Sequence, residues 1–445
     1  MVHARLVQII RGRVVTPTGV VDDGVVAVRG ERLAWVGPAA SAPDGLLDQA
    51  LAVSVAPWPD GPAPLVLPGL VDVHCHGGGG ASFPDATDHA AVRTAAREHL
   101  RHGTTTLVAS LVTAPEAVLL ERTALLADLA DAGEIAGIHV EGPYLSAARC
   151  GAQDPAHMTD GRPDAVRGLA EATRGHLVSM TVAPEVPGVL GAGGVVETLV
   201  QVGALPSFGH TDADAVAVTD AFAQARAALA RPGTRSLRAT VTHLFNGMPP
   251  MHHRSPGPVA ASLAAAARGE AVVELVADGV HLAPETVAAV FALVGPSSIV
   301  LVTDAMAAAG MPDGDYTLGA LDVVVRDGVA RLAAGGAIAG GTAHALDLVR
   351  ATVAAGVPVV DAVTAASATP AAVLGRTDIG RLEVGARADV VVVDADLRPL
   401  RVMRAGAWVE EEAVQERAGR HGRGRAGTQP PHLAGMPPLR SGPTC

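Results

Sequence analysis

The sequence predicts a (β/α)8 barrel that carries a small β-sandwich domain built from both ends of the chain. From residue 65 onward, short apolar runs alternate with helical stretches, and eight such runs can be marked. Strands that alternate with helices pair in parallel, and eight of them in a chain of 445 residues favour a closed barrel. Strand-like segments also occur before residue 65 and again after residue 379, which adds the β domain.

Residues 1–64 are predicted to form the N-terminal part of the β-sandwich. Apolar segments at Val14–Val15, Val25–Val28 and Leu33–Val36 are separated by Gly, Pro and Asp turn signals, which is typical of short strands. The stretch from Pro38 to Pro64 contains several prolines, and we expect a loop there.

Residues 65–378 are predicted to form the barrel, with helices such as Asp88–His102 and Glu116–Ala132 between the strands. An open doubly wound sheet would show the same alternation. The barrel is preferred because polar candidates follow six of the strands, and barrel enzymes build their sites at that face. The expected strands are Gly69–His74, Thr104–Ala109, Ile135–Val140, Val178–Val182, Leu205–Phe208, Ala239–Leu244, Val272–Ala277 and Ser298–Thr303.

Residues 379–409 are expected to complete the β-sandwich. Gly380–Leu382, Ala388–Val393 and Leu400–Met403 have strand character and would pair with the N-terminal strands. Residues 410–445 are rich in Arg, Gly and Pro and lack apolar periodicity, so we expect a mostly disordered tail.

Composition excludes several classes of protein. The net charge of -12 makes nucleic acid an unfavourable partner. No uninterrupted apolar stretch of about 18 residues is present, and the N-terminus lacks a signal-peptide pattern, so no membrane span is expected. The cysteines Cys75, Cys150 and Cys445 are far apart, which argues against a disulfide framework and for the reducing cytoplasm.

The segment from Leu67 to His76 is the first that predicts chemistry. It ends in His74 and His76, followed by four glycines at 77–80. Positions i and i+2 of a strand point to the same face, so both imidazoles would project together from a strand end. Two imidazoles on one face form half of a metal site, and glycines let the backbone pass close to it.

Further imidazoles and carboxylates follow the other predicted strands. His139 or Asp278 alone could be an ordinary hydrogen-bonded residue. The full series at strand ends is stronger evidence for a site, because chance would scatter such residues among helices and loops as well. Nitrogen and carboxylate ligands suit zinc, iron or cobalt. The sequence contains no lysine, so a carbamylated lysine cannot bridge two metals, and Glu141 is the natural replacement. The series comprises His139, Glu141, His210, His243, Asn246, Asp278, His281 and Asp304.

Several of these residues lie in longer motifs, through which the chain resembles the amidohydrolase superfamily, and within it the deacetylases of N-acetylglucosamine 6-phosphate. The resemblance covers about residues 5 to 405, and the Asn-Gly-Met-Pro segment is particularly specific. The motifs are His-Val-Glu-Gly-Pro-Tyr at 139–144, Gly-His-Thr-Asp-Ala at 209–213, Thr-His-Leu-Phe-Asn-Gly-Met-Pro-Pro at 242–250 with Arg-Ser-Pro-Gly at 254–257, Ala-Asp-Gly-Val-His at 277–281 and Val-Thr-Asp-Ala-Met at 302–306.

The resemblance implies a divalent metal, as one or two ions of Zn, Fe, Co or Mn. Glu141, His210 and His243 match the metal site common to the family. His74 and His76 match the additional pair of members that hold a second metal. The catalytic carboxylate matches Asp304.

The resemblance also implies a set of substrate contacts. Arg254 matches a phosphate-binding arginine that is contributed across the interface of a homodimer. Asn246 and Gly247 match backbone contacts to the phosphate, and His281 matches a substrate-binding histidine. The segment 337–341, with Ile338, Ala339 and Gly340, matches a loop that lines the sugar pocket.

One position departs from the family pattern. Near the acetyl group the family usually has Gly-x-His, whereas this chain has Gly151, Ala152 and Gln153. A glutamine can donate a hydrogen bond to a developing oxyanion but cannot carry a proton or a charge. We therefore expect Ala152 and Gln153 to contact the substrate.

The expected reaction is metal-dependent hydrolysis of N-acetylglucosamine 6-phosphate to glucosamine 6-phosphate and acetate, in amino sugar catabolism. The partner is thus a small sugar phosphate. Alternatives are deacetylation of the galacto epimer, deacylation of N-acyl amino acids, or a cyclic amidase. Arg254 favours a phosphate. A non-enzymatic scaffold is disfavoured because every expected ligand is present.

Overall fold

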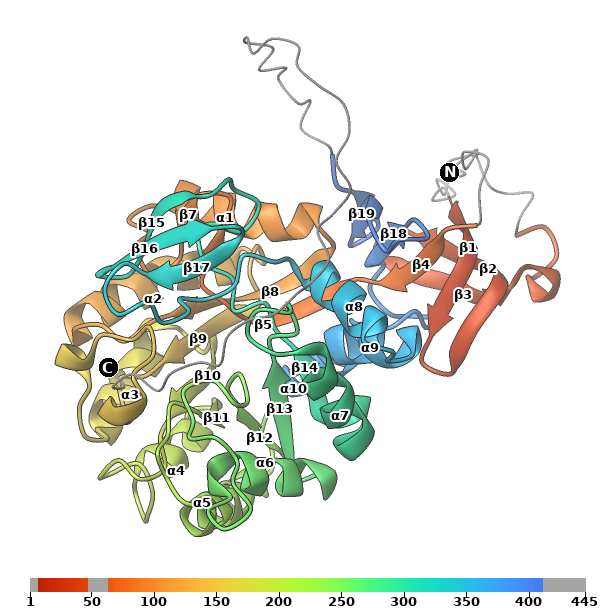
Figure 1. The fold of residues 1–445 in the computed structure, drawn as a ribbon. Helices are drawn as coiled ribbons and strands as arrows, with labels where there is room; N and C mark the ends of the chain where they lie inside the picture. The colour runs from red at the N-terminus through yellow and green to blue at the C-terminus, as the bar shows by residue number, and fades with distance from the viewer. Residues whose placement is uncertain (1–6, 47–62, 411–445) are drawn as a thin grey trace, which may run out of the picture.

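The computed structural model describes residues 7–46 and 63–410 (Figure 1). The predicted tail therefore lies outside the described residues, apart from Glu410, and so does much of the predicted loop before Pro64. None of the helices in the described ranges is long and apolar enough to cross a membrane.

Within the described residues, eight parallel strands form the central sheet, each beside its neighbour in the chain. Every residue of these strands is buried, as expected for strands covered on both faces. The strands are β5 (Leu70–Cys75), β8 (Thr104–Leu111), β9 (Gly137–Glu141), β10 (Leu177–Val182), β11 (Leu205–Phe208), β12 (Ala239–Val241), β13 (Ala271–Leu275) and β14 (Ile299–Leu301).

Backbone hydrogen bonds close this sheet between its first and last strands. The N–H of Asp304 donates to the carbonyl of His74 at 2.9 Å, and the N–H of His76 donates to the carbonyl of Ala305 at 2.7 Å. The segment after β14 is thereby tied to the end of β5. The predicted (β/α)8 barrel is confirmed.

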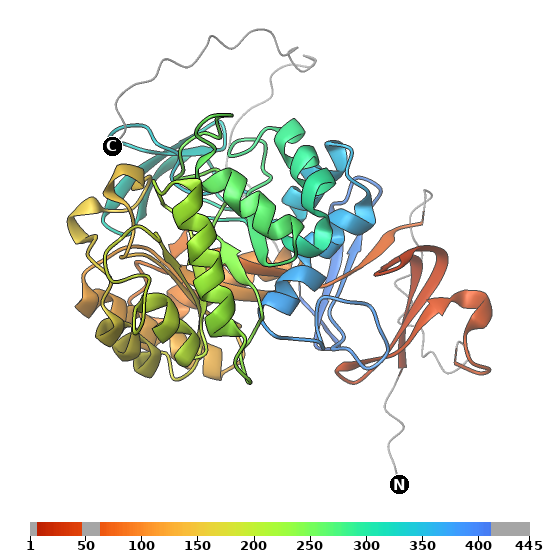
Figure 2. The same cartoon turned by 90° about the horizontal axis from the view of Figure 1, so that it is seen from below.

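Helices follow the barrel strands and cover the sheet (Figures 1 and 2). Helix α1 shows why these segments are helical: the Asp88 side chain accepts from the N–H of Ala91, and Val92, Ala95 and His99 bury one face. The helices are α1 (His89–Arg101), α2 (Glu116–Asp131), α3 (Pro163–Ala172), α4 (Val195–Gln201), α5 (Ala215–Leu229), α6 (Gly257–Ala267), α7 (Pro284–Val294), α8 (Ala345–Ala354), α9 (Val359–Ala366) and α10 (Ala368–Val373). Short 3-10 turns are η1 (Ala39–Ser41), η2 (Ala147–Arg149), η3 (Pro155–His157) and η4 (Pro296–Ser298).

A second sheet combines strands from both ends of the chain, which confirms the predicted β domain. In the described ranges its order is β20-β19-β18-β4-β1-β2-β3. Figure 2 shows the red N-terminal strands beside the barrel, with blue C-terminal segments between them. Its strands are β1 (Val7–Thr16), β2 (Gly19–Arg29), β3 (Arg32–Pro38), β4 (Leu65–Pro68), β18 (Val390–Val393), β19 (Pro399–Arg404) and β20 (Ala407–Trp408).

Two details of this sheet differ from the sequence-based expectation. The strand β4 lies at the start of the segment assigned to the barrel, but it pairs with β1 and β18 in the second sheet. The predicted strand Gly380–Leu382 is wrong, because Gly380 has a φ of 71° and its Cα faces the carbonyl of Ser367 too closely for a side chain. Leu382 instead packs into the core of the second sheet from an irregular segment.

A further antiparallel sheet, which the sequence analysis did not predict, lies between β14 and α8. It consists of β15 (Gly314–Leu318), β16 (Leu321–Arg326) and β17 (Val329–Leu332). A small hairpin, β6 (Gly77–Gly78) with β7 (Ala81–Ser82), directly follows β5. The first of these additions carries Leu318 to the mouth of the barrel.

Candidate active site

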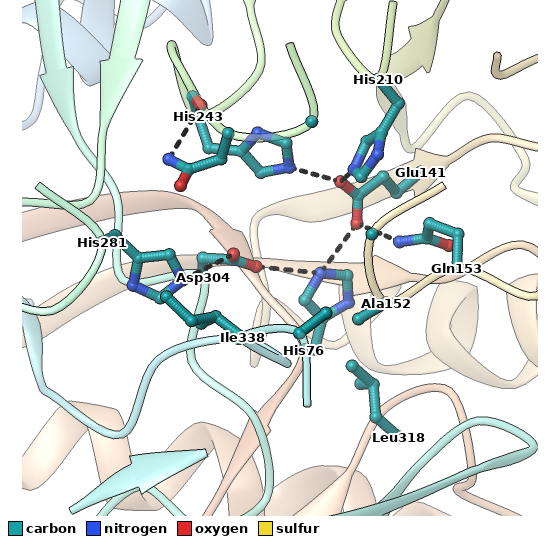
Figure 3. Close-up of a pocket in the computed structure, with 15 residues that line it drawn as sticks. His76, Glu141, Ala152, Gln153, His210, His243, His281, Asp304, Leu318 and Ile338 are labelled. Carbon is teal, nitrogen blue, oxygen red and sulfur yellow. Dashed lines mark hydrogen bonds and ion pairs between the residues drawn. The ribbon is translucent and has the colours of Figure 1, made fainter. Parts of the chain in front are cut away.

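The carboxyl ends of five barrel strands bring the predicted site residues together. His74 lies in β5, and Glu141 is the last residue of β9. His210, His243 and Asp304 follow β11, β12 and β14 with φ values of 46°, 26° and 46°. Such left-handed backbone is uncommon outside glycine and clusters at functional sites. The chain turns sharply after these strands, and Figure 3 shows the three side chains directed into one pocket.

Glu141 lies at the centre of the cluster and is buried (Figure 3). Its Oε1 atom lies 3.0 Å from His210 Nε2 and 2.8 Å from His243 Nε2. Its Oε2 atom lies 3.2 Å from His76 Nε2 and accepts a hydrogen bond of 2.7 Å from the amide of Gln153. One carboxylate thus faces two separate groups of imidazoles.

A second group of potential ligands lies beside the first. His74 Nε2 and His76 Nε2 are 3.1 Å apart, and Asp304 Oδ1 lies 3.4 Å and 3.2 Å from them. The buried triads His74, His76, Asp304 and Glu141, His210, His243 each have ligand atoms close enough to hold one metal ion.

The tautomers of three histidines fit a metal centre. His74 Nδ1 lies 3.0 Å from Glu274 Oε2, His76 Nδ1 3.3 Å from the Ser110 carbonyl, and His210 Nδ1 2.7 Å from the Arg149 carbonyl. Since these oxygens accept hydrogen bonds, each Nδ1 carries a proton, and each Nε2 faces the cluster, where it can bind a metal once it has lost its own proton. Metal-bound histidines are oriented in this way. The residues therefore fit a divalent metal ion.

Both central carboxylates are ionised in this environment. Burial alone would raise the pKa of Asp304, but the adjacent charges of His74 and His76 outweigh it and lower this pKa. The pKa of Glu141 is likewise lowered, because hydrogen bonds from His210 and His243 outweigh the effect of burial. An ionised Asp304 can accept a proton.

Two buried carboxylates that sequence reasoning missed support the ligands from behind. Glu274 contacts His74 and accepts from the N–H of His243 at 3.1 Å. Asp72 accepts from the hydroxyl of Thr303 at 2.6 Å and from the N–H of His74 at 3.2 Å. Burial raises the pKa of Asp72 to about 6, although these hydrogen bonds oppose the change. The available signal was a charge inside an otherwise apolar strand, Val272-Val273-Glu274-Leu275.

The cluster opens into a cavity of about 250 Å³ (Figure 3). His74 and Ala339 are fully buried and are not among the residues that line it. Gly151 and Leu318 line it as well, although neither was predicted to contact the substrate, and Ala337 of the predicted loop 337–341 also lines it. The predicted residues that line it are His76, Glu141, Ala152, Gln153, His210, His243, Asn246, Gly247, His281, Asp304, Ile338 and Gly340.

Arg254 is the predicted contact that the structure does not bring to the pocket. It is exposed on the loop between β12 and α6, and it is not among the described residues that line the cavity. Within the described residues of one chain, therefore, Arg254 does not line the pocket. Its assignment as a contact made across a dimer interface stays a prediction.

Two polar side chains at the pocket have fixed orientations. The N–H of Thr113 donates to Gln153 Oε1 at 2.7 Å, so the amide nitrogen of Gln153 points to Glu141. His281 Nδ1 lies 2.8 Å from Asp278 Oδ2, and its Nε2 lies 4.0 Å from Asp304 Oδ2. Asp278 therefore presents the other ring nitrogen of His281 to the cavity.

Comparisons with known proteins agree with this arrangement. The model of the amidohydrolase family matches residues 65–416. N-acetylglucosamine-6-phosphate deacetylase of Vibrio furnissii is 35% identical over 368 residues, which are 81% of this chain and 86% of that protein. N-acetylgalactosamine-6-phosphate deacetylase of Escherichia coli O157:H7 is 34% identical, with 78% and 87% covered.

Two solved structures of N-acetylglucosamine-6-phosphate deacetylases also resemble this chain. A mutant of N-acetyl-D-glucosamine-6-phosphate deacetylase from Mycobacterium smegmatis, in complex with N-acetyl-D-glucosamine-6-phosphate, superposes with a TM-score of 0.80. The two sequences are 39% identical, and the match covers 90% of this chain and 99% of the other. The deacetylase from Thermotoga maritima is 26% identical, with a TM-score of 0.75 and coverage of 91% and 100%.

Proposed function

We propose that this chain, which belongs to the amidohydrolase family, hydrolyses the N-acetyl group of N-acetylglucosamine 6-phosphate to glucosamine 6-phosphate and acetate. Relatives named for this reaction cover most of the chain, and the solved relative from Mycobacterium smegmatis contains this sugar phosphate. The observation that carries the proposal is the position of Glu141, which joins two histidine groups beneath a cavity that Asp304 also lines.

We propose that Glu141, His210 and His243 hold one divalent metal ion, and that His74 and His76 can hold a second. Zinc, iron, cobalt and manganese all accept this mixture of imidazole and carboxylate ligands. When bound, such an ion polarises a carbonyl oxygen and lowers the pKa of water toward about 7. Glu141, with an oxygen facing each group, is the residue whose loss should disturb both ions.

The proposed proton carrier is Asp304. Its carboxylate is ionised and lines the cavity, so it can take a proton from the attacking water. A bond forms between the water oxygen and the acetyl carbon, and the bond from that carbon to the sugar nitrogen breaks. Asp304 then returns the proton to the departing nitrogen. The sugar leaves as an amine, and the acetyl carbon becomes the carboxylate carbon of acetate.

The substrate contacts come from this chain and, we propose, from a second copy. His281, oriented by Asp278, would form a hydrogen bond with the sugar, and Asn246 with Gly247 would present backbone groups to the phosphate. Arg254 would supply the guanidinium from the partner of a homodimer, since a planar guanidinium matches phosphate oxygens.

The cytoplasmic location stays a prediction from the cysteine content.

The substitution Asp304→Asn tests the proposed mechanism. An amide cannot accept the proton, so acetate release should fall by at least about 100-fold. The metal ion held by Glu141, His210 and His243 keeps all three ligands, so metal content measured on the same sample should stay at one ion per chain or more. The matched control is Asp160→Asn, an exposed aspartate outside the pocket, which should retain full activity. Near-normal turnover by Asp304→Asn would contradict the assignment.

A further inference from the structure

We propose that Leu318 limits the acyl group that this enzyme removes to about the length of acetyl, because its side chain separates the catalytic cavity from a second, apolar cavity. The proposal rests on the proposed deacylation of an amino sugar phosphate and adds a determinant of acyl specificity to it. It is argued from the polarity of the pocket, the position of the second cavity and the packing of the wall between them.

One end of the catalytic pocket offers the polar ring of His281 beside Ile338, and the other end offers Leu318 (Figure 3). His281 lies on one side of Asp304 and His76, whereas Leu318 lies on the opposite side, next to Ala152. A sugar with its hydroxyls needs polar partners, and a methyl group needs apolar ones. A carbonyl held between Asp304 and Glu141 therefore directs its sugar substituent toward His281 and its alkyl substituent toward Leu318.

A second cavity of about 300 Å³ lies behind this alkyl side. Its lining is mainly apolar and includes Leu111, Val112, Pro115, Leu119, Gly319 and Ala320. Two pairs of residues place the cavities on opposite faces of one wall. Leu318 lines the first cavity and its neighbour Gly319 lines the second. Gln153 lines the first and its hydrogen-bond partner Thr113 lines the second.

The wall itself is the turn between β15 and β16, pressed against the end of β8. Leu318 is 3% exposed and belongs to one buried apolar cluster with Val112. Gly319 has a φ of 57°, and a Cβ there would lie 2.9 Å from a methyl carbon of Val112. The turn is thus seated against Val112 without free space, and the Leu318 side chain is the part that faces the catalytic cavity.

Shortening Leu318 should join the two cavities. Leu318→Ala removes the isopropyl carbons that end the alkyl side of the pocket, and an alkyl chain longer than acetyl can then extend into apolar space. Each additional methylene that leaves water for such a surface favours binding. In the unaltered protein the same methylenes would collide with Leu318, because close-packed side chains around a cavity move little to make room.

The test compares N-acetyl, N-propionyl, N-butyryl and N-hexanoyl glucosamine 6-phosphate as substrates of the metal-reconstituted full-length protein. For the unaltered protein, kcat/KM should fall by at least about 10-fold for each of the first two added methylenes. In Leu318→Ala the ratio of kcat/KM for butyryl to that for acetyl should rise by at least about 10-fold. Leu318→Val should show a smaller rise in the same direction.

Leu321→Ala is the matched control. Leu321 pairs with Leu318 across the same turn but lines neither cavity. Its acyl preference should equal that of the unaltered protein, and thermal unfolding of all variants reports whether they fold. If Leu318→Ala does not fold, the ratio in Leu318→Val decides.

Two results would overturn the inference while leaving the proposed function intact. One is an unaltered protein that hydrolyses acetyl and butyryl substrates equally well. The other is a Leu318 variant whose activity changes by the same factor for every acyl length, which would give Leu318 a structural role only. Failure of the unaltered protein to release any acyl group from these sugar phosphates would instead refute the proposed function itself.

Discussion

At the scale of single residues, the site depends on which atom of each side chain faces inward. The sequence predicts Glu141, His210, His243 and the pair His74 and His76, because each stands at or just past the end of an apolar run. It does not predict the oxygen atoms that fix the tautomers, since these come from distant positions such as Glu274 and the Arg149 carbonyl. Only the fold brings such partners together.

His99 shows how a buried histidine supports the site and makes stability depend on pH. It is fully buried in α1, and its Nε2 lies 2.8 Å from the carbonyl of Gly77, just after the His74 and His76 pair. Within the described residues its Nδ1 has no hydrogen-bond partner. Burial, followed by the charge of His344, lowers the pKa of His99 to about 4.

The lowered pKa of His99 gives a signed prediction. Between pH 6.5 and about 4 the unfolded chain binds a proton at His99 that the folded chain does not. This contribution to stability is therefore present above pH 6.5 and is lost as the pH falls toward 4, by roughly 3 kcal/mol in all. His99→Gln keeps a donor for Gly77 but cannot titrate, so its unfolding free energy should fall less across this range.

The measurement is urea unfolding of metal-free protein at several pH values, so that release of metal does not contribute. The difference between the unaltered protein and His99→Gln should narrow or change sign as the pH falls. A difference that stays constant from pH 7 to pH 4 would contradict the lowered pKa of His99.

At the scale of elements, strand existence is predictable but strand ends are not. The strand β11 occupies the predicted residues 205–208, whereas β12 ends at Val241 and β14 at Leu301, before their predicted ends. Both stop because His243 and Asp304 turn the backbone into the left-handed region. Apolar character continues past these turns, so an apolar run overestimates the strand. The sheet of β15 to β17 was not predicted, because it is inserted after the eighth barrel strand and adds no strand to the alternating barrel pattern.

Gly69 joins two of these elements, β4 of the second sheet and β5 of the barrel. A Cβ at this position would lie 2.1 Å from Thr105 Oγ1 and 2.7 Å from Asp389 Cβ. Gly69→Ala should therefore lower the free energy of unfolding by about 1–3 kcal/mol. The control is Gly168→Ala in α3, where a Cβ would meet no atom within 4 Å. This substitution should stabilise the helix by about 0.5–1 kcal/mol. Urea unfolding of both variants measures this, and a Gly69→Ala protein as stable as the unaltered one would contradict the close contact.

At the scale of the whole molecule, the two sheets are held together by a buried polar contact. Asp389 is 2% exposed and pairs with Arg387, while its Oδ2 also accepts from the hydroxyl of Thr105 in β8 at 3.2 Å. Its carbonyl accepts from the N–H of Gly69 at 2.9 Å. The sequence indicates that both chain ends are β-structured, but their strand order depends on these long-range contacts, which no local pattern encodes.

The proposed phosphate contact also belongs to the whole molecule. Arg254 is exposed and does not line the pocket of its own chain, and its proposed role is in the pocket of a second copy. The sequence motif could indicate a phosphate ligand but not the distance between Arg254 and the pocket. A substrate that differs only in its phosphate therefore tests both the reaction and this part of the account.

The most direct measurement is acetate release by purified, metal-reconstituted protein from N-acetylglucosamine 6-phosphate, with unphosphorylated N-acetylglucosamine in parallel. The account predicts rapid release from the phosphorylated sugar and release at least about 100-fold slower from the other, because charge-assisted contacts to the phosphate are lost. Equal rates would contradict a phosphate site. Release from neither sugar, with metal bound, would contradict the proposed deacetylase function and leave an amidohydrolase with a different amide substrate.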